Sequence, residues 1–245
     1  EGVQVQPAAE NDEVISITGG GLLIEKGAEV LATTSDKLGL VVNTGDDDIV
    51  INGNVAAKVH VRGAGDIKVE GEADAHNAVE EIYLGWEKAA TDAPAAGNIT
   101  VKNADVKYYF TKTAGTFNIE NTADVYILDS YFSSACNGKG TPTINVKNAT
   151  KITNITAGWK DNTNALTIDG VTGTVGTVSY NGKGAVALSN LEGNATTIEY
   201  TNEEAAGKLS VASKSNKAIA VTTLTYKGQG DVEVSATATK EISVA

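Results

Sequence analysis

The sequence predicts an all-β fold, a single-domain parallel β-helix (β-solenoid) with coils of roughly 20–23 residues. Three observations support it: a short strand phrase recurs, it returns at similar intervals, and the side chains are small. Hydrophobic residues make up 41% of the 245 residues, aromatic residues only 5%, and 26 residues are glycine. This composition is too apolar for a disordered chain, and its apolar residues are too scattered for a membrane-spanning segment.

The repeated phrase has two apolar residues around one polar residue, followed by a polar position and a turn residue that is often Asn or Gly. Such alternation is typical of a strand with one buried face. From residue 99 onward the phrases begin 18, 27, 22, 20, 23 and 23 residues apart. They begin at Ile49, Ile67, Ile99, Phe117, Ile144, Leu166 and Val186, with weaker copies at Leu209 and Val232.

A second alternating segment follows each phrase, so one coil holds at least two strands and two turns. That is enough chain to circle a narrow solenoid once, with parallel pairing between coils. Stacking places like residues above one another. The Asn that ends a phrase is therefore expected to adopt the left-handed conformation and to bond to its counterpart one coil away. The second segments are 106–108, 125–127, 152–155, 175–178, 198–200, 224–226 and 242–244.

The alternative architecture is an antiparallel β-sandwich, which also has short alternating strands. A sandwich rarely repeats one strand phrase and usually buries several large aromatic residues, so the solenoid is favoured. Residues 1–13 are expected to form an N-terminal strand and extension, and residues 14–245 the solenoid domain. Helix content should be low. Residues 74–81 are the best candidate for a helical turn, and residues 87–96 are expected to form an excursion loop closed by Pro94.

The repeated phrase resembles the coils of right-handed parallel β-helices of the pectate-lyase-like superfamily, which is widespread among secreted and surface-displayed microbial proteins. The resemblance covers about residues 40–245 and concerns the repeat pattern alone. It implies the fold and an extracellular location. Enzymes of that superfamily act on acidic polysaccharides with Asp clusters and essential Arg or Lys. Arg62 is the single arginine here, and the Gly-His-Gly and Arg-Ile-Lys phrases are missing, so no catalytic residue is predicted.

The charge balance excludes some partners. The net charge is −12 and the lysines are dispersed, so neither nucleic acid nor an anionic membrane surface is an expected partner, and no membrane insertion is predicted. The chain starts at Glu1 and contains no Met, which suggests a processed, secreted protein at the cell surface. The lone Cys136 cannot form an intrachain disulfide, and His60 and His76 belong to no metal motif.

No cofactor is predicted, with calcium as the possible exception. Asp46, Asp47 and Asp48 are consecutive acids in an expected turn and form a weak candidate Ca²⁺ site, although acids in a turn of an acidic protein are ordinary. Asn-x-Thr sequons make four asparagines possible glycosylation sites. These are Asn98, Asn148, Asn154 and Asn194.

Aromatic residues suggest a binding strip. Equivalent positions in a regular solenoid project from one side, and exposed aromatic rings stack on sugars or anchor a protein partner. The strip would bind glycans or a host or cell-surface protein. Alternatively, these residues cover the solenoid flank or fill loops. The predicted strip comprises Tyr83, Trp86, Tyr108, Tyr126, Tyr131 and Trp159.

The two ends of the chain resemble strands. Val3 and Val5 alternate with polar residues near the start, as do Ile242 and Val244 near the end. Open strand edges tend to pair, so these residues predict edge-to-edge assembly with other copies. The alternative is that the segments continue into further domains.

These observations predict a non-enzymatic extracellular structural protein that self-assembles into a filament or surface layer through edge pairing. The principal partner would be the chain itself. A surface adhesin or carbohydrate-binding β-helix module is the alternative, supported by the aromatic strip. A polysaccharide-degrading enzyme comes third.

Overall fold

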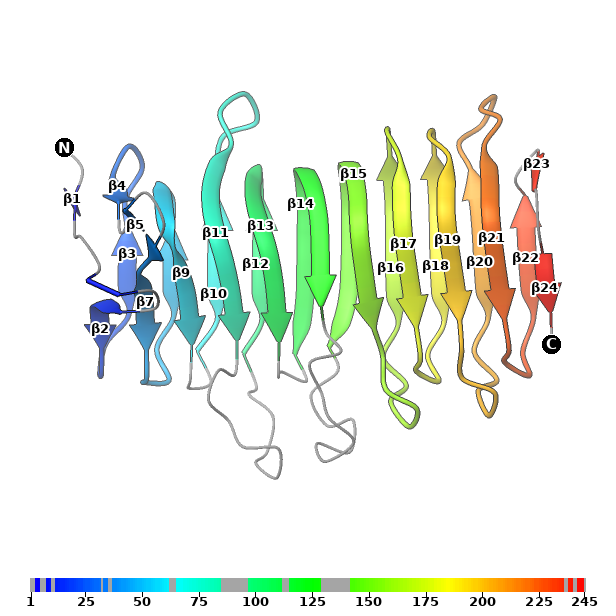
Figure 1. Cartoon of the computed structure of the whole chain (residues 1–245), viewed down its shortest axis with the longest axis horizontal. Coiled ribbons are helices and arrows are strands. Elements are labelled where there is room, and N and C mark those ends of the chain that lie inside the picture. The colour runs from blue at the N-terminus through cyan, green and yellow to red at the C-terminus, as the bar shows by residue number, and fades with distance from the viewer. Residues whose placement is uncertain are drawn as a thin grey trace.

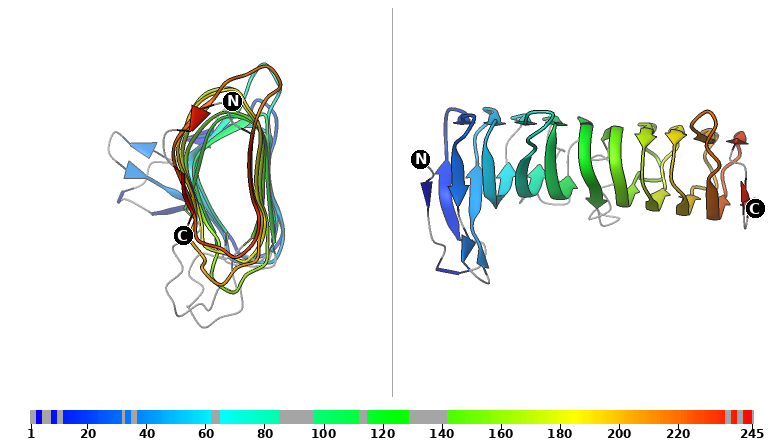
Figure 2. Two further views of the ribbon diagram at one scale, coloured as in Figure 1. Left: turned by 90° about the vertical axis from the view of Figure 1, so that its right-hand side faces the viewer. Right: turned by 90° about the horizontal axis from the view of Figure 1, so that it is seen from above.

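The computed structural model describes residues 3–4, 8–9, 12–31, 33–34, 37–61, 65–84, 97–111, 115–128, 142–235, 238–239 and 242–244. Its coils stack along one axis (Figure 1), and viewed down that axis they superpose into a flattened oval (Figure 2). A single sheet contains 22 strands, and the pairings described in it are parallel. The parallel β-solenoid is therefore confirmed, and the antiparallel sandwich is wrong.

The oval has two flat sides. The first face consists of strands paired in chain order, each leading into a turn towards the second face. Its strands are β3 (Leu22–Ile24), β8 (Ile49–Ile51), β10 (Ile67–Glu70), β12 (Ile99–Lys102), the first parts of β14 (Thr116–Leu128) and β15 (Thr143–Ala157), β16 (Leu166–Val171), β18 (Val186–Leu191), β20 (Leu209–Ser213) and β22 (Val232–Ser235).

The second face holds the other strand of each coil, and β14 and β15 continue through the corner into it. Its further strands are β1 (Val3–Gln4), β2 (Glu13–Ile17), β4 (Glu29–Leu31), β7 (Leu40–Asn43), β9 (Asn54–Val61), β11 (Asn77–Leu84), β13 (Ala104–Thr111), β17 (Val175–Tyr180), β19 (Ala195–Tyr200), β21 (Ala220–Tyr226), β23 (Ala238–Thr239) and β24 (Ile242–Val244).

An antiparallel hairpin of β5 (Thr33–Thr34) and β6 (Lys37–Leu38) separates β4 from β7. Strand β9 pairs with β4 through its first residues and with β7 through its last. In the coil before β9, β4 and β7 therefore together take the place of a single strand. The hairpin is thus an insertion within a coil. Figure 2 shows blue N-terminal segments standing out to one side of the oval.

The core forms because every second side chain of a first-face strand points into the solenoid. In the first face, Ile67 pairs with Ile99 and Val69 with Val101, and all four side chains are fully buried. The same pattern continues through every later coil to Leu209 and Val211. Each added coil removes two or more branched apolar side chains from water, worth about 1.5–3 kcal/mol each. The pairings reproduce the spacings predicted from residue 99 onward.

The predicted asparagine column is confirmed at the corner after the first face. Asn103, Asn121, Asn148 and Asn190 have φ between 50° and 55°, and Gly170 occupies the same corner with φ 79°. The Asn121 side-chain amide donates to Asn103 Oδ1 at 2.6 Å. Asparagine serves here because its short polar side chain tolerates the left-handed region and bonds along the stack.

Buried tyrosines form a ladder at the opposite corner. Tyr180, Tyr200 and Tyr226 pair in register at the ends of three successive strands, with ring centroids 5.5 and 5.1 Å apart. The Tyr200 hydroxyl donates to the Gly184 carbonyl at 3.0 Å, and the Tyr226 hydroxyl to the Gly207 carbonyl at 2.8 Å. The three rings fill the narrow end of the oval in the last coils.

Two of the local predictions concern the turn at residues 74–81 and the loop at residues 87–96. The helical turn predicted over residues 74–81 is wrong, because a tight turn bridged by Glu72 and Ala75 leads directly into β11. The excursion loop at residues 87–96 lies outside the described residues. Within the segment expected to form an N-terminal extension, β1 pairs in parallel with β4 as a further level of the stack.

Candidate interaction surfaces

The predicted aromatic strip is brought together in part. Tyr83 on β11 pairs with Phe110 of β13, and Phe110 pairs with Leu128 of β14. Tyr108 and Tyr126 therefore occupy one register position on neighbouring strands, and Tyr83 lies one row away. Tyr83 and Tyr126 are half-buried on the second face. Three of the six strip residues thus share one area.

The other strip residues do not join this area in the described part of the chain. Trp159 is half-buried in the turn after β15, where its carbonyl accepts the Asn162 N–H at 2.8 Å. Trp86 and Tyr131 lie outside the described residues. The strip as a continuous binding surface stays a prediction.

A buried histidine supports the first tyrosine of the strip. His60 Nε2 lies 2.7 Å from Glu81 Oε1, and the His60 ring meets Tyr83 edge-on with centroids 5.4 Å apart. His60 is only 5% exposed. Its role in the described structure is to tie β9 to β11 beneath this part of the second face.

The acidic turn bonds to neighbouring coils. The buried Asn43 shapes it by accepting the Gly45 N–H at 2.9 Å and donating to the Asp47 carbonyl at 2.6 Å. Asp47 Oδ2 accepts the Gly20 N–H at 2.8 Å, and Asp48 Oδ1 accepts the Asp66 N–H at 2.9 Å. These bonds tie the acidic turn to the coils on either side of it.

The described residues contain no group of three or more His, Cys, Asp or Glu side chains placed to hold a metal. Calcium binding at Asp46, Asp47 and Asp48 stays a prediction. A rise in melting temperature on adding calcium, reversed by a chelator, would support it. An unchanged melting temperature would contradict it.

Asp48 begins a column of side-chain caps that sequence reasoning missed. Asp66 Oδ1 accepts the Asn98 N–H at 2.7 Å, and Asn98 Oδ1 accepts the Thr116 N–H at 2.8 Å. Each acceptor stands just before a strand of the first face and bonds to its counterpart one coil later. The sequence signal was an Asp or Asn immediately before the strand phrase.

The four sequon asparagines differ in environment. The Asn98 amide donates to the Asp66 carboxylate at 3.1 Å, and the Asn154 amide donates to the Ile127 carbonyl at 3.1 Å. Asn148 and Asn194 are exposed. Exposure makes these two the better acceptors for a glycan, and glycosylation stays a prediction for all four.

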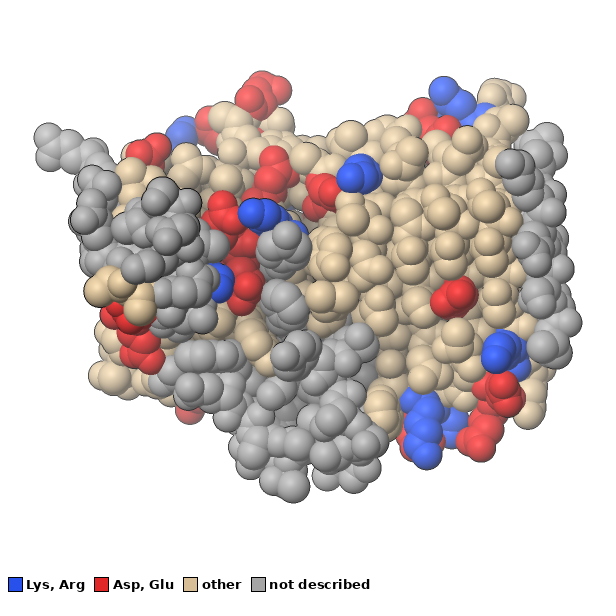
Figure 3. Space-filling model, in the orientation of Figure 1, with Lys and Arg blue, Asp and Glu red and all other residues tan. Residues whose placement is uncertain are grey.

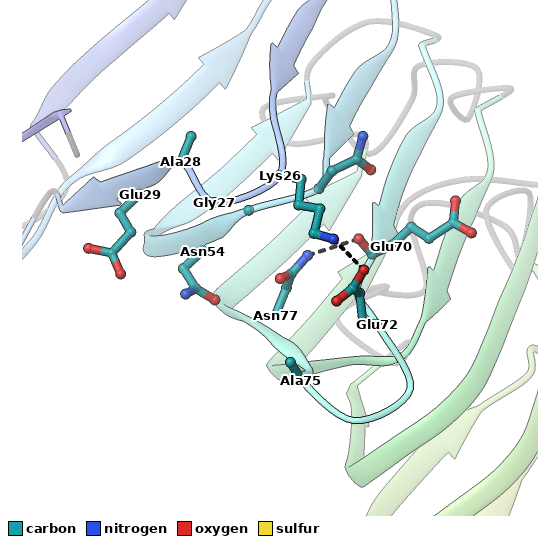
Figure 4. Close-up of a pocket in the computed structure, with 12 residues that line it drawn as sticks. Lys26, Gly27, Ala28, Glu29, Asn54, Glu70, Glu72, Ala75 and Asn77 are labelled. Atoms are coloured by element: carbon teal, nitrogen blue, oxygen red, sulfur yellow. Dashed lines mark hydrogen bonds and ion pairs between the residues drawn. The ribbon is translucent and has the colours of Figure 1, made fainter. Parts of the chain in front are cut away.

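A hollow of about 480 Å³ lies on the N-terminal coils at the corner after the first face (Figure 4). Lys26 reaches across it to form an ion pair with Glu72, and the Asn77 amide donates to the Glu70 carbonyl at 2.8 Å. The hydrogen bond and charge of Lys68 lower the pKa of Glu70. Three of the charged groups that line the hollow, Lys26, Glu70 and Glu72, are therefore already in ion pairs.

The ends of the stack expose residues that are buried elsewhere. In the described structure β3 pairs only with β8, and β22 only with β20. Val232 and Val234 in β22 are half-buried, whereas Leu209 and Val211, their partners in β20, are fully buried. Leu22 of β3 is half-buried too, and Leu23 is 57% exposed.

The terminal residues predicted for assembly pair within the chain where they are described. Val3 pairs with Val30, Ile242 with Leu224 and Val244 with Tyr226. Val5 lies outside the described residues. These pairings add Val3, Ile242 and Val244 to the two ends of the second face, and their role in assembly stays a prediction.

A further surface, rich in threonine, was not predicted from the sequence. The last coils carry two outward rows on the second face, called the threonine face below. All eight residues are half-buried, and the available signal was a pair of polar residues two positions apart, with threonine in at least one of them, in each of four strands. The first row is Asn154, Thr177, Thr197 and Thr223. The second row is Thr156, Ser179, Glu199 and Thr225.

Comparison of the chain with protein-family models, with curated proteins and with solved structures gave no match. The likeness to parallel β-helices therefore holds at the level of the fold. Across the part of the chain that the structure describes, no helix is long and apolar enough to cross a membrane.

Proposed function

We propose that this chain is a non-enzymatic, extracellular structural protein whose copies associate end to end through strand pairing. The single observation that carries the proposal is the half-buried state of Val232 and Val234 in β22. The equivalent residues of the preceding first-face strands from β8 to β20 are buried between two neighbours. One more coil on the open side of β22 would complete the pattern.

A second copy offers a suitable coil at its other end. Its β3 carries Leu22 and Ile24 on the side that faces the core, and these residues pair in register with Ile49 and Ile51 of β8. The same alternation matches Val232 and Val234, so β3 of one copy can continue the first face beyond β22 of another. Contact between two different ends does not close on itself, and it generates an open filament.

The extracellular location rests on the acidic composition and the resemblance to secreted β-helices. A net charge of −12 also keeps copies apart until matching edges meet. Detection of the chain in the culture medium or on the cell surface of its source, and its absence from the cell interior, is the expected result. Retention inside the cell would contradict this part of the proposal.

Light scattering and negative-stain electron microscopy of the purified chain test the assembly. The unaltered chain should form filaments as its concentration rises, and Val232→Lys with Val234→Lys should remain monomeric, because charges would enter the new interface. Ser235→Lys is the matched control, since Ser235 is exposed on the same strand and should still polymerise. Circular dichroism verifies that all variants fold. A strictly monomeric unaltered chain would overturn the proposal.

A carbohydrate-binding adhesin is the second candidate, favoured by the shared area of Tyr83, Tyr108 and Tyr126. Glycan-array binding that is lost in Tyr83→Ala with Tyr126→Ala would support it. Trp86→Ala and Trp159→Ala test whether the predicted strip extends further. Silence of the unaltered chain on every glycan would count against this function.

A further inference from the structure

The threonine face differs in charge from the rest of the molecule. Among its two rows only Glu199 is charged, in a chain that carries 50 charged residues and a net charge of −12. Figure 3 shows acidic and basic residues gathered over the N-terminal coils, while a broad area over the strands from β15 to β21 is almost free of them. Like-charge repulsion between two copies is therefore smallest where these faces meet.

The same two rows change character along the axis. In the N-terminal coils, the register positions of the first row are taken by Tyr126, Tyr108 and Glu81. Those of the second row are taken by Leu128, Phe110, Tyr83 and His60. The threonine positions therefore do not follow from the fold alone. In the last coils the strands pair without a register shift, which keeps the outward residues of each row directly in line.

Threonine suits contact with an identical surface. Its hydroxyl both donates and accepts, so two like faces can bond to each other. Its branched side chain has few rotamers to lose on burial, unlike the Lys and Glu side chains that are depleted at interface cores. Two copies related by a two-fold axis would place the two rows of each opposite the rows of the other.

We propose that the threonine face is a lateral docking surface for the same face of a second copy of this chain. Recognition of a sugar would call for aromatic platforms, which lie on the N-terminal coils, and recognition of nucleic acid would call for cations. Four strands about 4.8 Å apart and two outward rows about 6.6 Å apart give roughly 250 Å² on each copy. A total of about 500 Å² is well below the size of a standard interface, so a single contact is weak.

A weak contact gains strength by repetition. Its contribution to a stable assembly rests on the proposed function, because an end-to-end filament presents one threonine face per copy and many weak contacts then act together. The proposed outcome is side-by-side pairing of filaments. The contact between two faces itself needs no end pairing, and this allows the two ideas to be tested separately.

The test is cross-linking with a short bis-maleimide. Cys136→Ser supplies the background, and a single cysteine is introduced by Thr197→Cys on the threonine face or by Thr100→Cys on the first face. Thr100 is a half-buried threonine like Thr197, but it pairs with Lys68. Thr197→Cys should yield cross-linked dimers several-fold faster than Thr100→Cys. Added salt should raise its yield, because the rest of the surface repels.

Two further variants make the test decisive. Thr177→Lys added to Thr197→Cys should abolish cross-linking with an unchanged melting temperature, and Glu199→Gln should increase it. All measurements are repeated with Val234→Lys, which blocks the ends. Face cross-links in both backgrounds support the inference, whether or not filaments form. Equal yields at Thr197→Cys and Thr100→Cys overturn it, and filaments with such equal yields leave the end-to-end proposal standing alone.

Discussion

The N-terminal coils, residues 22–128, and the C-terminal coils, residues 142–235, share one pairing scheme but differ in regularity. Successive first-face partners such as Ile49, Ile67, Ile99 and Phe117 are 18, 32 and 18 residues apart. From Ile144 onward the steps are 22, 20, 23 and 23 residues. The parallel stack thus tolerates large excursions in one half and holds a nearly constant length in the other.

The two halves also join their coils differently at the start of each first-face strand. The N-terminal coils use the side chains of Asp48, Asp66 and Asn98 as acceptors for the next coil. The backbone bond at the start of each first-face strand is common to both halves, as in Ile67 N–H to the Asn98 carbonyl at 2.9 Å and Leu166 N–H to the Ala185 carbonyl at 3.0 Å. The side-chain caps are therefore an addition that holds coils whose turns differ in length.

The tyrosine ladder allows the largest test of this comparison. Tyr200→Ala should lower the free energy of unfolding by about 3–5 kcal/mol, because it empties a fully buried aromatic site between two other rings. Denaturant unfolding measures the loss. Hydrogen exchange should rise in the C-terminal coils first, since each coil contacts mainly its neighbours. Equal acceleration in both halves would show that the ladder is not a local support.

Matched turns give the next largest effect. A methyl group at Gly184 would lie 2.2 Å from the Asn164 carbonyl oxygen, whereas one at Gly19 meets nothing within 4 Å. Gly184→Ala should therefore cost about 1–3 kcal/mol. Gly19→Ala, in the turn between β2 and β3, should change stability little. Thermal unfolding of both variants measures the difference, and similar melting temperatures would contradict the idea that the C-terminal turns stack tightly.

The asparagine corner is shared by both halves. Asn121→Val should destabilise by about 1–2 kcal/mol, because a branched side chain is forced into the left-handed region and the bond to Asn103 is lost. Asn121→Gly keeps the conformation and should recover most of that loss. Chemical denaturation of the two variants provides the measurement. Equal losses in the two variants would mean that the side-chain amide bond, and not the left-handed backbone conformation, accounts for the stability of this corner.

The sequence predicted the stack because the inward residues repeat from coil to coil. Individual strands were missed where the outward residues hide the alternation. In β3 the outward Leu23 is apolar, which hides the alternation of Leu22 and Ile24. In β11 the buried residues are Val79, Ile82 and Leu84, with two outward residues in succession. A step of three residues resembles helical spacing, so the alternation of this strand is hard to recognise in the sequence.

The same step of three recurs along the second face. Buried residues at 175, 178 and 180 and at 195, 198 and 200 place tyrosine last. The ladder had a sequence signal in Tyr-x-Gly-x-Gly at 180–184 and 226–230, since each glycine makes room for the tyrosine or the adjacent turn. The threonine face and the end strands could not be predicted from the sequence alone. They join residues about one coil apart, and only the pairing register between coils shows which residues lie side by side.

Two buried hydroxyls sharpen the comparison further. Tyr109 Oη finds no hydrogen-bond partner within the described structure, whereas Tyr200 donates to Gly184. Tyr109→Phe in the N-terminal coils should be neutral or stabilising, and Tyr200→Phe should cost about 1 kcal/mol. Equilibrium unfolding in denaturant decides between these signs. A loss in Tyr109→Phe would mean that its hydroxyl is satisfied in solution.

The same pair of variants has a pH dependence. Burial raises the pKa of both Tyr109 and Tyr200, so the folded chain retains protons that the unfolded chain releases. Stability is therefore complete below pH about 10 and falls as the pH rises above it. Each Phe variant should lose less stability in alkaline solution than the unaltered chain.

Charge pairs on the first face should have the smallest effect. Glu70, Lys102, Glu120, Lys147 and Asp169 alternate in sign along one row, and Lys147 Nζ lies 3.8 Å from Glu120 Oε1. Both side chains are largely exposed, so water screens their attraction. A double-mutant cycle of Glu120→Gln and Lys147→Gln should give a coupling of at most about 0.5 kcal/mol.

High salt should remove that small coupling. A coupling well above about 1 kcal/mol would exceed what exposed pairs provide. It would mean that the row of alternating charges holds the uneven N-terminal coils in register, a task that the tyrosine ladder and the matched turns perform in the C-terminal coils. A negligible coupling would assign this row to solubility and leave the side-chain caps as the device that distinguishes the two halves.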